Sequence, residues 1–460
     1  MKKWILVLTA CFAFAGNVLA KELPPVGGTP KDFALTETQS MTLDNGLTVT
    51  FVPYGNTPKA TLRLITKTGN YEDAGKDAIS DLSFSLLTEG TKNRSALEIA
   101  EQAANMGGEV GTSVGMNSSF IQLDVLSEFV DQAAELVADV AINAQIKQED
   151  LDRERTNFLR NIQVQRSQPG GQANEAFFGA IYDTHPYSLV FPDEEAVNSI
   201  TVAEVSAFLN ANLVAKRSHL YVSGKFDLAA AKAAVSSAFA GMQSGESQQI
   251  VSPEYKGKGG FVFIERENAP QSTIRIGLPV VDPSHDDYIG LQLMDSLLGG
   301  SFSSRITSNI REDKGYTYSP RSVVSTRVQS ALWYQGADVT AESTAASLFE
   351  IIKEIKRLQE EPPTAEELEG FKNYIAGIYV LQNSSRTAII NQLWFLESHG
   401  LPLSRLETYV QKINAVTPGE LTKLAKQYLN LGNMTLVVVG DSKAVKPQLA
   451  AEKTLANWIK

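Results

Sequence analysis

The sequence predicts an α+β fold built from two similar halves, each a mostly antiparallel sheet with helices packed on one face. Two observations carry this prediction. Short apolar stretches alternate with long amphipathic ones, and strand pairs come before and after the helical stretches of each half, which favours sheets covered by helices on one face. The same order of elements also occurs twice along the chain. Two such halves facing each other would form a clam-like chamber.

The duplication is visible as pairs of matched residues at nearly constant spacing. Pro58, Thr61 and Arg63 precede Pro270, Thr273 and Arg275 by 212 residues, and Thr201 and Glu204 precede Thr417 and Glu420 by 216. Thr-x-x-Glu is a capping box, in which the two side chains satisfy free amides at a helix start. Each box opens a predicted helix that leads to a short apolar strand ending in Gly. Two common capping boxes could coincide by chance, but several pairs at a fixed offset favour a true duplication.

The chain divides into five segments. Residues 1–20 have the features of a secretory signal, because Lys2 and Lys3 precede a short apolar core that ends in small residues at Ala20. The remaining segments are an N-terminal extension (21–40), a first half (41–243), a linker rich in Gly, Ser and Gln (244–258) and a second half (259–460). Residues 345–359 and 365–385 are the clearest helices.

Composition limits location and partners. The chain has 460 residues, a formal net charge of −11 and one cysteine, Cys11, which lies within the signal. A mature chain cut after Ala20 would contain no cysteine, which suits a bacterial periplasm better than a disulfide-rich extracellular setting. Lipidation of Cys11 is the less favoured alternative. No later run is long and apolar enough to be a transmembrane segment. The acidic balance argues against nucleic acid and anionic membranes as partners.

Residues 78–91 carry the most informative pattern. Their small and apolar positions resemble the zinc helix of the pitrilysin/insulysin-type inverzincin metallopeptidases, in which His-x-x-Glu-His leads into an apolar turn and Gly-Thr. In that alignment Asp81 stands in place of the first His, Phe84 in place of the catalytic Glu, and Ser85 in place of the second His. The resemblance therefore implies the frame of a zinc peptidase without its metal chemistry.

The third ligand of the family is a Glu on a later helix, seven residues after another Glu. Here Glu154 keeps the first acidic position, but Asn161 stands in the ligand position. Zinc catalysis needs three protein ligands, an open position for water and a general base. The four histidines do not help, because no two of them are three to five residues apart: His185, His219, His285 and His399. We expect no metal on this chain, Asp81 as a solvated or capping residue, and His185 as a loop residue that orders a turn.

Residues 304–319 form the strongest positive motif. Ile306 and Ile310 lie on one predicted helical face, Gly315 suits a left-handed helix end, and a strand is expected from Tyr316. The segment resembles the second-half motif of the same peptidase family, an Arg followed seven residues later by a Tyr.

In this chain that pair is Arg311 and Tyr318. In the family, the pair holds the substrate backbone and stabilises the oxyanion, and both side chains can donate hydrogen bonds for this work. The residues alone support a structural role equally well, with Arg311 at a helix end and Tyr318 on a half-buried strand. The resemblance across both halves favours the functional role.

A further stretch, containing Gly108, Val110 and Gly111, resembles the edge strand of the family. An unpaired edge can hold an extended peptide by adding it as another strand. A glycine-marked strand start without any binding role explains the same residues equally well.

These patterns lead to one functional hypothesis and its alternatives. We expect a non-zinc subunit of a heterodimeric periplasmic peptidase, which supplies Arg311 and Tyr318 to the active site of a homologous, zinc-bearing partner acting on peptides. The alternative is a catalytically inactive peptide-binding or scaffold protein of the same fold. A self-sufficient peptidase is the least favoured possibility, because three of the four metal or base positions are neutral.

Overall fold

The structure is a computed structural model that describes residues 35, 37–73, 75–255 and 259–455. The expected signal peptide (1–20) and most of the expected extension (21–40) lie outside the described residues. No described helix is long and apolar enough to cross a membrane.

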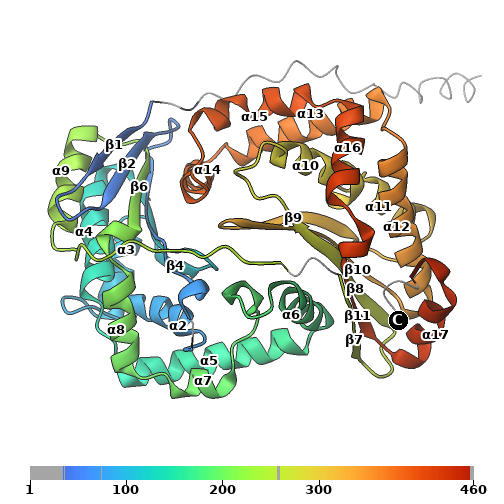
Figure 1. Cartoon of the computed structure of the whole chain (residues 1–460). Helices are drawn as coiled ribbons and strands as arrows, with labels where there is room; N and C mark the ends of the chain where they lie inside the picture. Colours follow the sequence, from blue (N-terminus) through green and yellow to red (C-terminus); the bar gives the residue numbers. More distant parts are fainter. Residues whose placement is uncertain (1–34, 36, 74, 256–258, 456–460) are drawn as a thin grey trace, which may run out of the picture. The chain divides into compact units, whose positions relative to one another are not determined.

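The first half contains a six-stranded sheet with the order β1-β2-β6-β3-β5-β4 (Figure 1). Its strands are β1 (Gln39–Thr42), β2 (Thr48–Pro53), β3 (Lys59–Thr66), β4 (Val110–Val114), β5 (Ser119–Leu126) and β6 (Ser218–Gly224). Its helices are α2 (Ile79–Ser85), α3 (Ala96–Asn105), α4 (Val130–Asn143), α5 (Gln148–Ser167), α6 (Pro169–Tyr182), α7 (Glu194–Ser199), α8 (Val202–Asn212) and α9 (Leu228–Phe239).

The second half contains a five-stranded sheet with the order β7-β11-β8-β10-β9. Its strands are β7 (Phe261–Glu265), β8 (Gln271–Val280), β9 (Arg321–Arg327), β10 (Ser330–Thr340) and β11 (Thr435–Gly440). Its helices are α10 (Tyr288–Asp295), α11 (Arg305–Thr307), α12 (Thr344–Glu360), α13 (Ala365–Gln382), α14 (Arg386–Ser398), α15 (Ser404–Ala415), α16 (Pro418–Tyr428) and α17 (Ser442–Ala451).

The two sheets share one pairing pattern, so the predicted fold class and its two similar halves are confirmed. In each sheet one pair is parallel, β2 with β6 and β7 with β11, and the other pairs are antiparallel. Both predicted capping boxes form, with Thr201 bound to Glu204 at the start of α8 and Thr417 bound to Glu420 at the start of α16. The capping boxes that indicated the repeat therefore start a helix at the equivalent position in each half.

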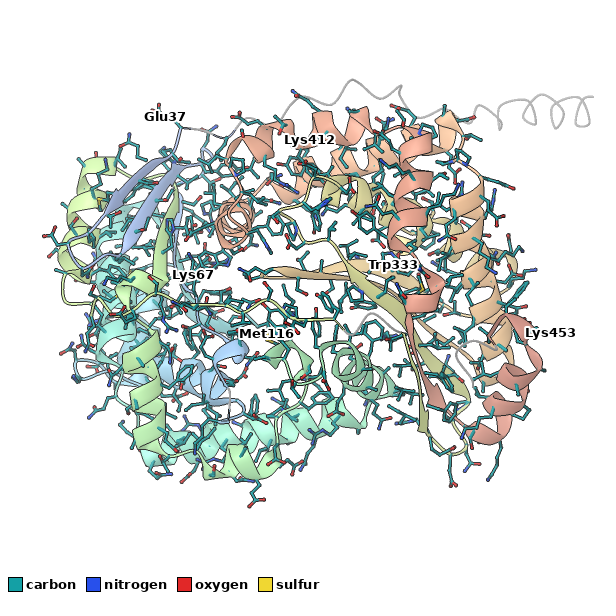
Figure 2. The ribbon with its side chains drawn as sticks, viewed as in Figure 1. Glu37, Lys67, Met116, Trp333, Lys412 and Lys453 are labelled. Atoms are coloured by element: carbon teal, nitrogen blue, oxygen red, sulfur yellow. The ribbon has the colours of Figure 1, made fainter. Side chains whose placement is uncertain are left out.

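Each half packs its own helices against one face of its own sheet. In the first half, α4 contacts β3, β5 and α9, and in the second half α12 contacts β10, α16 and α17. Each of these layers encloses a separate apolar core. Trp333 is fully buried in the second core, where its indole N–H donates to Asp295 at 2.8 Å (Figure 2).

The opposite face of each sheet receives a helix from the other half, which the sequence did not indicate. Helix α6 of the first half packs on β8 and β11, and α14 of the second half packs on β3 and β6 (Figure 1). Two further apolar clusters form at these contacts. The repeat-related arginines reach across in the same way. Arg63 donates to Asn391 of α14 at 2.6 Å, and Arg275 donates to Asn174 of α6 at 3.1 Å.

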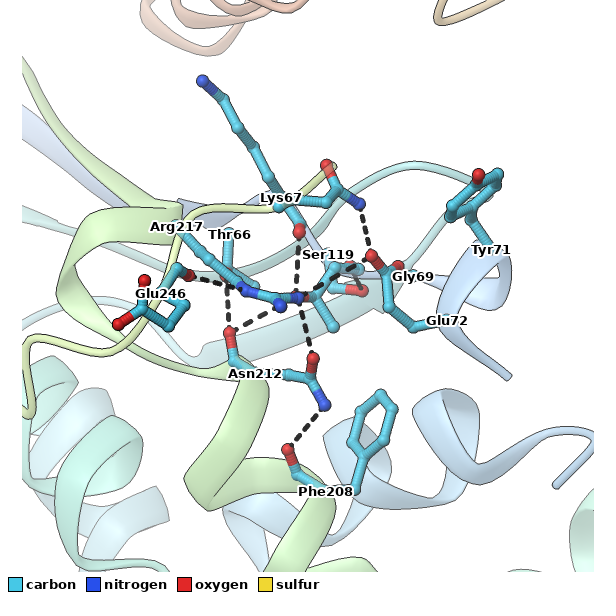
Figure 3. A network of polar contacts seen from close by, with 12 residues as sticks. Thr66, Lys67, Gly69, Tyr71, Glu72, Ser119, Phe208, Asn212, Arg217 and Glu246 are labelled. Carbon is cyan, nitrogen blue, oxygen red and sulfur yellow. Dashed lines mark hydrogen bonds and ion pairs between the residues drawn. The ribbon is translucent and has the colours of Figure 1, made fainter. Parts of the chain in front are cut away.

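Residues 240–255, which follow α9, are mostly exposed, as expected of a linker, but polar contacts fix them in place. Arg217 donates to the carbonyl of Glu246 at 3.0 Å and lies 3.7 Å from the carboxylate of Glu72 (Figure 3). Further along, the amide of Val251 donates to the phenol of Tyr71 at 2.9 Å. This segment is therefore held against the first half rather than hanging free.

His185 contributes to the same fastening. Its Nδ1 accepts from the amide of Tyr187, and its Nε2 lies 3.0 Å from the carbonyl oxygen of Val251. The ring therefore orders the turn that follows α6, as predicted, and also holds the segment between the halves.

Candidate functional site

The helix that carries Arg311 is short, widely wound in its second part and firmly anchored. It begins as α11 and continues as the π-helical turn η7 (Ser308–Asp313), whose wider winding is often found at functional sites. Ile306 and Ile310 are fully buried, as predicted from their spacing. Gly315 ends the turn at φ +66°, which suits glycine. The strand predicted from Tyr316 is wrong, because β9 begins only at Arg321.

Two polar contacts fix this turn to neighbouring helices. Arg305 forms a bidentate ion pair with Glu367 of α13, in which Nε and one Nη each donate to a carboxylate oxygen at 2.8 Å. The guanidinium of Arg305 lowers the pKa of the Glu367 carboxyl. Asn309 is buried and donates to Glu350 and Glu354 of α12 at 2.9 and 2.8 Å. The backbone under Arg311 is therefore held on both sides, which suits a side chain that must keep a fixed position.

Arg311 and Tyr318 lie together, and a third residue joins them. The Arg311 guanidinium carbon lies 5.0 Å from the centre of the Tyr318 ring and 4.2 Å from the centre of the Phe302 ring. Tyr318 is 81% exposed and Phe302 is 67% exposed. The structural alternative for Tyr318, a half-buried residue on a strand, does not hold. Nε of Arg311, which carries one of its five N–H donors, also lies 3.2 Å from the carboxylate of Glu312. The two rings and this ion pair together restrict the rotation of the guanidinium.

Phe302 was not identified from the sequence, although a signal was present. It is a large apolar side chain in a loop, two residues after Gly300 and nine residues before Arg311. An exposed aromatic ring beside a candidate site residue is more informative than a buried one.

The degenerate metal positions lie on α2 and α5, which pack against each other. Asp81 is half-buried in the first turn of α2 and accepts a hydrogen bond from Asn70 at 2.6 Å. Burial raises the pKa of Asp81 to about 6. The expectation that Asp81 is solvated is therefore wrong, and it does not cap the helix, because the N-cap is Ala78.

Asp73 lies next to Asp81 in the same buried cluster. Its carboxylate accepts from the amide of Ser80 at 3.0 Å and from Asn70 at 3.2 Å. Burial, with a smaller contribution from the charge of Asp81, raises the pKa of Asp73 to about 7. Asn70 thus donates to two carboxyls whose pKa values are both raised by burial.

The other three positions offer no metal ligand. Phe84 is buried in the first core, Ser85 donates its hydroxyl to the carbonyl of Leu82, and Asn161 is exposed on α5. One carboxyl tied to Asn70 beside a phenyl ring, a hydroxyl and an amide does not fit zinc, which takes Cys, His and carboxylate ligands in sets of three or four. Within the described residues, no three His, Cys, Asp or Glu side chains cluster in a way that could hold a metal ion.

Gly108, Val110 and Gly111 lie at or just before β4, which is the outermost strand of the first sheet. This strand also packs against α2. Gly108 has a structural reason to be glycine, because a Cβ there would lie 1.8 Å from the carbonyl oxygen of Asp124. At Gly111 a Cβ would meet open space. The structure thus places a free strand edge beside the degenerate metal positions, and a peptide-binding role for it stays a prediction.

Comparison with protein families gives two matches in series. The family described as "Insulinase (Peptidase family M16)" matches residues 50–190, and the family described as "Peptidase M16 inactive domain" matches residues 199–375. Among curated proteins, the chain is 26% identical over 326 residues to an uncharacterized zinc protease of Rickettsia felis, covering 69% of this chain and 77% of that protein. It is 24% identical over 363 residues to the uncharacterized zinc protease YmxG of Bacillus subtilis, covering 76% and 85%.

Solved structures match over most of the chain. A peptidase M16 inactive domain from Pseudomonas fluorescens gives a TM-score of 0.83 at 24% identity, covering 88% of this chain and 98% of that one. A protease from Helicobacter pylori gives a TM-score of 0.80 at 20% identity, covering 88% and 100%. These likenesses support the fold.

Proposed function

Because the chain belongs to the M16 (insulinase) peptidase family, we propose that it is the non-zinc subunit of a heterodimeric periplasmic peptidase. A homologous partner would provide the intact zinc helix. This chain would provide Arg311 and Tyr318, which bind the peptide and stabilise the negative charge that forms on the carbonyl oxygen during hydrolysis. Zinc would belong to the partner, where it would activate water.

The observation that carries the proposal is the contrast between the two sites. The four metal and base positions hold Asp, Phe, Ser and Asn, which do not fit zinc. Arg311, by contrast, lies on an anchored turn beside Tyr318, and the phenol is open to solvent. A large exposed aromatic residue beside a half-buried arginine contributes little to the stability of this chain alone. The exposure of Tyr318 is explained if a second molecule binds to its side chain.

A mixing experiment tests the proposal. The purified chain is combined with a homologue that carries His-x-x-Glu-His, and cleavage of a fluorogenic peptide is followed. We expect hydrolysis to rise steeply on mixing. We expect Arg311→Ala to lower kcat/KM on the order of a hundredfold, since one donor to an oxyanion has this effect. Tyr318→Phe should act in the same direction.

Tyr374→Phe is the matched control, because Tyr374 is also an exposed tyrosine, at 48%, but lies on α13 away from the stacked residues. It should leave the rate unchanged. If the Arg311 and Tyr318 variants hydrolyse as fast as the unmodified mixture, the shared site is wrong. A chain that binds peptides but raises no hydrolysis with any zinc-bearing homologue would instead support the alternative of an inactive peptide-binding or scaffold protein.

A further inference from the structure

A pocket of about 350 Å³ lies between the two halves, and neither Arg311 nor Tyr318 lines it. Its walls come from the end of β3, the β4–β5 turn, the linker, the β9–β10 turn and the end of α14. Lys67 and Met116 mark its position in Figure 2. The volume is within the range of small-ligand sites.

The lining is positively charged, although the chain as a whole is acidic. Lys67 and Arg327 line the pocket, and none of its lining residues is Asp or Glu. His399 adds no charge at neutral pH, because burial lowers its pKa to about 4. In a chain with a net charge of −11, two cations without a lining acid are a local exception. Such a pocket favours an anion.

Among the described residues, Arg327 forms no ion pair with an Asp or Glu. Its guanidinium carbon lies 5.7 Å from the centres of the Phe178 and Tyr187 rings. Its Nε is buried, and it has no hydrogen-bond acceptor in the part of the chain that the structure describes. A buried donor without an acceptor is costly, so an arginine in this state is suited to an acceptor that arrives with a ligand.

The ammonium of Lys67 can also donate to a ligand. Its ammonium lies 3.0 Å from Glu397, which also accepts from His219 and Tyr221. The Lys67 side chain remains 38% exposed, and an ammonium has three N–H donors. Because Glu397 also accepts hydrogen bonds from His219 and Tyr221, its contact with Lys67 leaves the ammonium able to bind a second carboxylate.

The rest of the lining is apolar or bears amides. Trp394 and Met116 both line the pocket, and the indole N–H of Trp394 donates to Ser118 at 3.2 Å. Asn117 is held in place, because its oxygen accepts from the amide of Val328 at 3.2 Å. An apolar wall, fixed amides and two cations together match a peptide that ends or branches in a carboxylate, more closely than they match a bare inorganic anion.

We propose that this pocket binds a carboxylate of a peptide, either its C-terminus or an acidic side chain, through Arg327 and Lys67. The inference depends on the proposed function only for its biological meaning, since peptides are the expected substrates. The binding itself needs no zinc-bearing partner. Its failure would therefore leave the two-chain hydrolysis untouched, and failure of the hydrolysis would leave the binding testable.

Calorimetry on the full chain tests the proposal with two pairs of short peptides. One pair differs only in a C-terminal carboxylate or amide. The other pair is amidated and differs only in an internal Glu or Gln. We expect the carboxylate member of at least one pair to bind tenfold or more tightly than its neutral twin, and to bind more weakly as salt is added. The pair that discriminates identifies the source of the carboxylate.

Variants locate the binding. Arg327→Gln removes the charge at similar length and should abolish the preference, and Lys67→Gln should weaken it without disturbing the Phe178 and Tyr187 rings. Arg321→Gln, at the exposed start of the same strand, is the matched control and should bind normally. Equal binding of acid and amide peptides in both pairs would overturn the proposal. So would a preference that survives in both Arg327→Gln and Lys67→Gln.

Discussion

The Asp81→Asn substitution tests whether the carboxyl of Asp81 is a buried structural group of α2. Asp81 accepts a hydrogen bond from the side chain of Asn70, and an asparagine oxygen can accept it equally well. The substitution therefore removes a poorly solvated charge while it keeps the contact. Because the pKa of Asp81 is raised, we expect the variant to be more stable than the parent chain wherever the parent carboxyl is ionised.

The magnitude follows from the two pKa values. Burial raises the pKa of Asp81 from its ordinary 3.8 to about 6. Each unit of difference between the pKa in the folded chain and the pKa in the unfolded chain changes the free energy of unfolding by about 1.4 kcal/mol. The folded chain holds its proton more tightly than the unfolded chain, so the free energy of unfolding falls as the pH rises from about 4 to about 6. Above pH ~6, the buried charge of Asp81 destabilises the parent by at most about 3 kcal/mol, and the variant lacks this destabilisation.

Chemical denaturation followed by circular dichroism at pH ~4 and pH ~8 measures this difference. We expect the variant and the parent to unfold alike at the lower pH, and the variant to gain up to about 3 kcal/mol at the higher pH. Asp131→Asn is the control, because Asp131 also lies in the first turn of a helix, α4, but is exposed. An equal effect of Asp81→Asn at both pH values, or a loss of stability at pH ~8, would refute the reasoning.

Three further substitutions give independent checks. Glu397→Gln should cost about 2 kcal/mol near neutral pH and progressively less on acidification. Burial alone would raise the pKa of Glu397, but contact with His219 holds it at about 2. The ionised carboxylate therefore stabilises the folded chain above the unfolded pKa of 4.5, and this stabilisation is lost as the pH falls towards 2. A loss of stability that does not change with pH in denaturation experiments would contradict this prediction. Thr417→Ala should cost about 1 kcal/mol by removing the cap of α16, while Thr417→Ser should retain it, and an equal loss in both variants would argue against the capping role. Phe302→Ala should lower hydrolysis by the mixed subunits about fivefold with little change in melting temperature, because the ring orients Arg311; an unchanged rate would remove Phe302 from the site.

Features set by neighbours along the chain could be predicted from the sequence. The helices predicted at 345–359 and 365–385 occur as α12 (Thr344–Glu360) and α13 (Ala365–Gln382), because their apolar period and the cap at Thr364 are local signals. The two capping boxes and the repeat depend on the same short-range chemistry. The fold class followed from these elements.

Features set by distant contacts could not be predicted. An apolar stripe on α6 or α14 shows that the helix is covered on one side, but not which sheet covers it, so the exchange of helices between halves was missed. The environment of Asp81 depends on Asn70, which reaches it from a separate turn of the chain. The π-helical winding before Gly315 also escaped prediction, because Ile306 and Ile310 fall on one face in either winding.

The central claim is that Arg311 and Tyr318 act on a reaction carried out in another molecule. The most direct measurement uses the double variant Arg311→Ala/Tyr318→Phe and determines, for one zinc-bearing partner, both the dissociation constant of the complex and its rate of peptide hydrolysis. We expect the complex to form with unchanged affinity and the rate to fall by at least two orders of magnitude. A complex that forms normally and hydrolyses peptides at the full rate would contradict the claim.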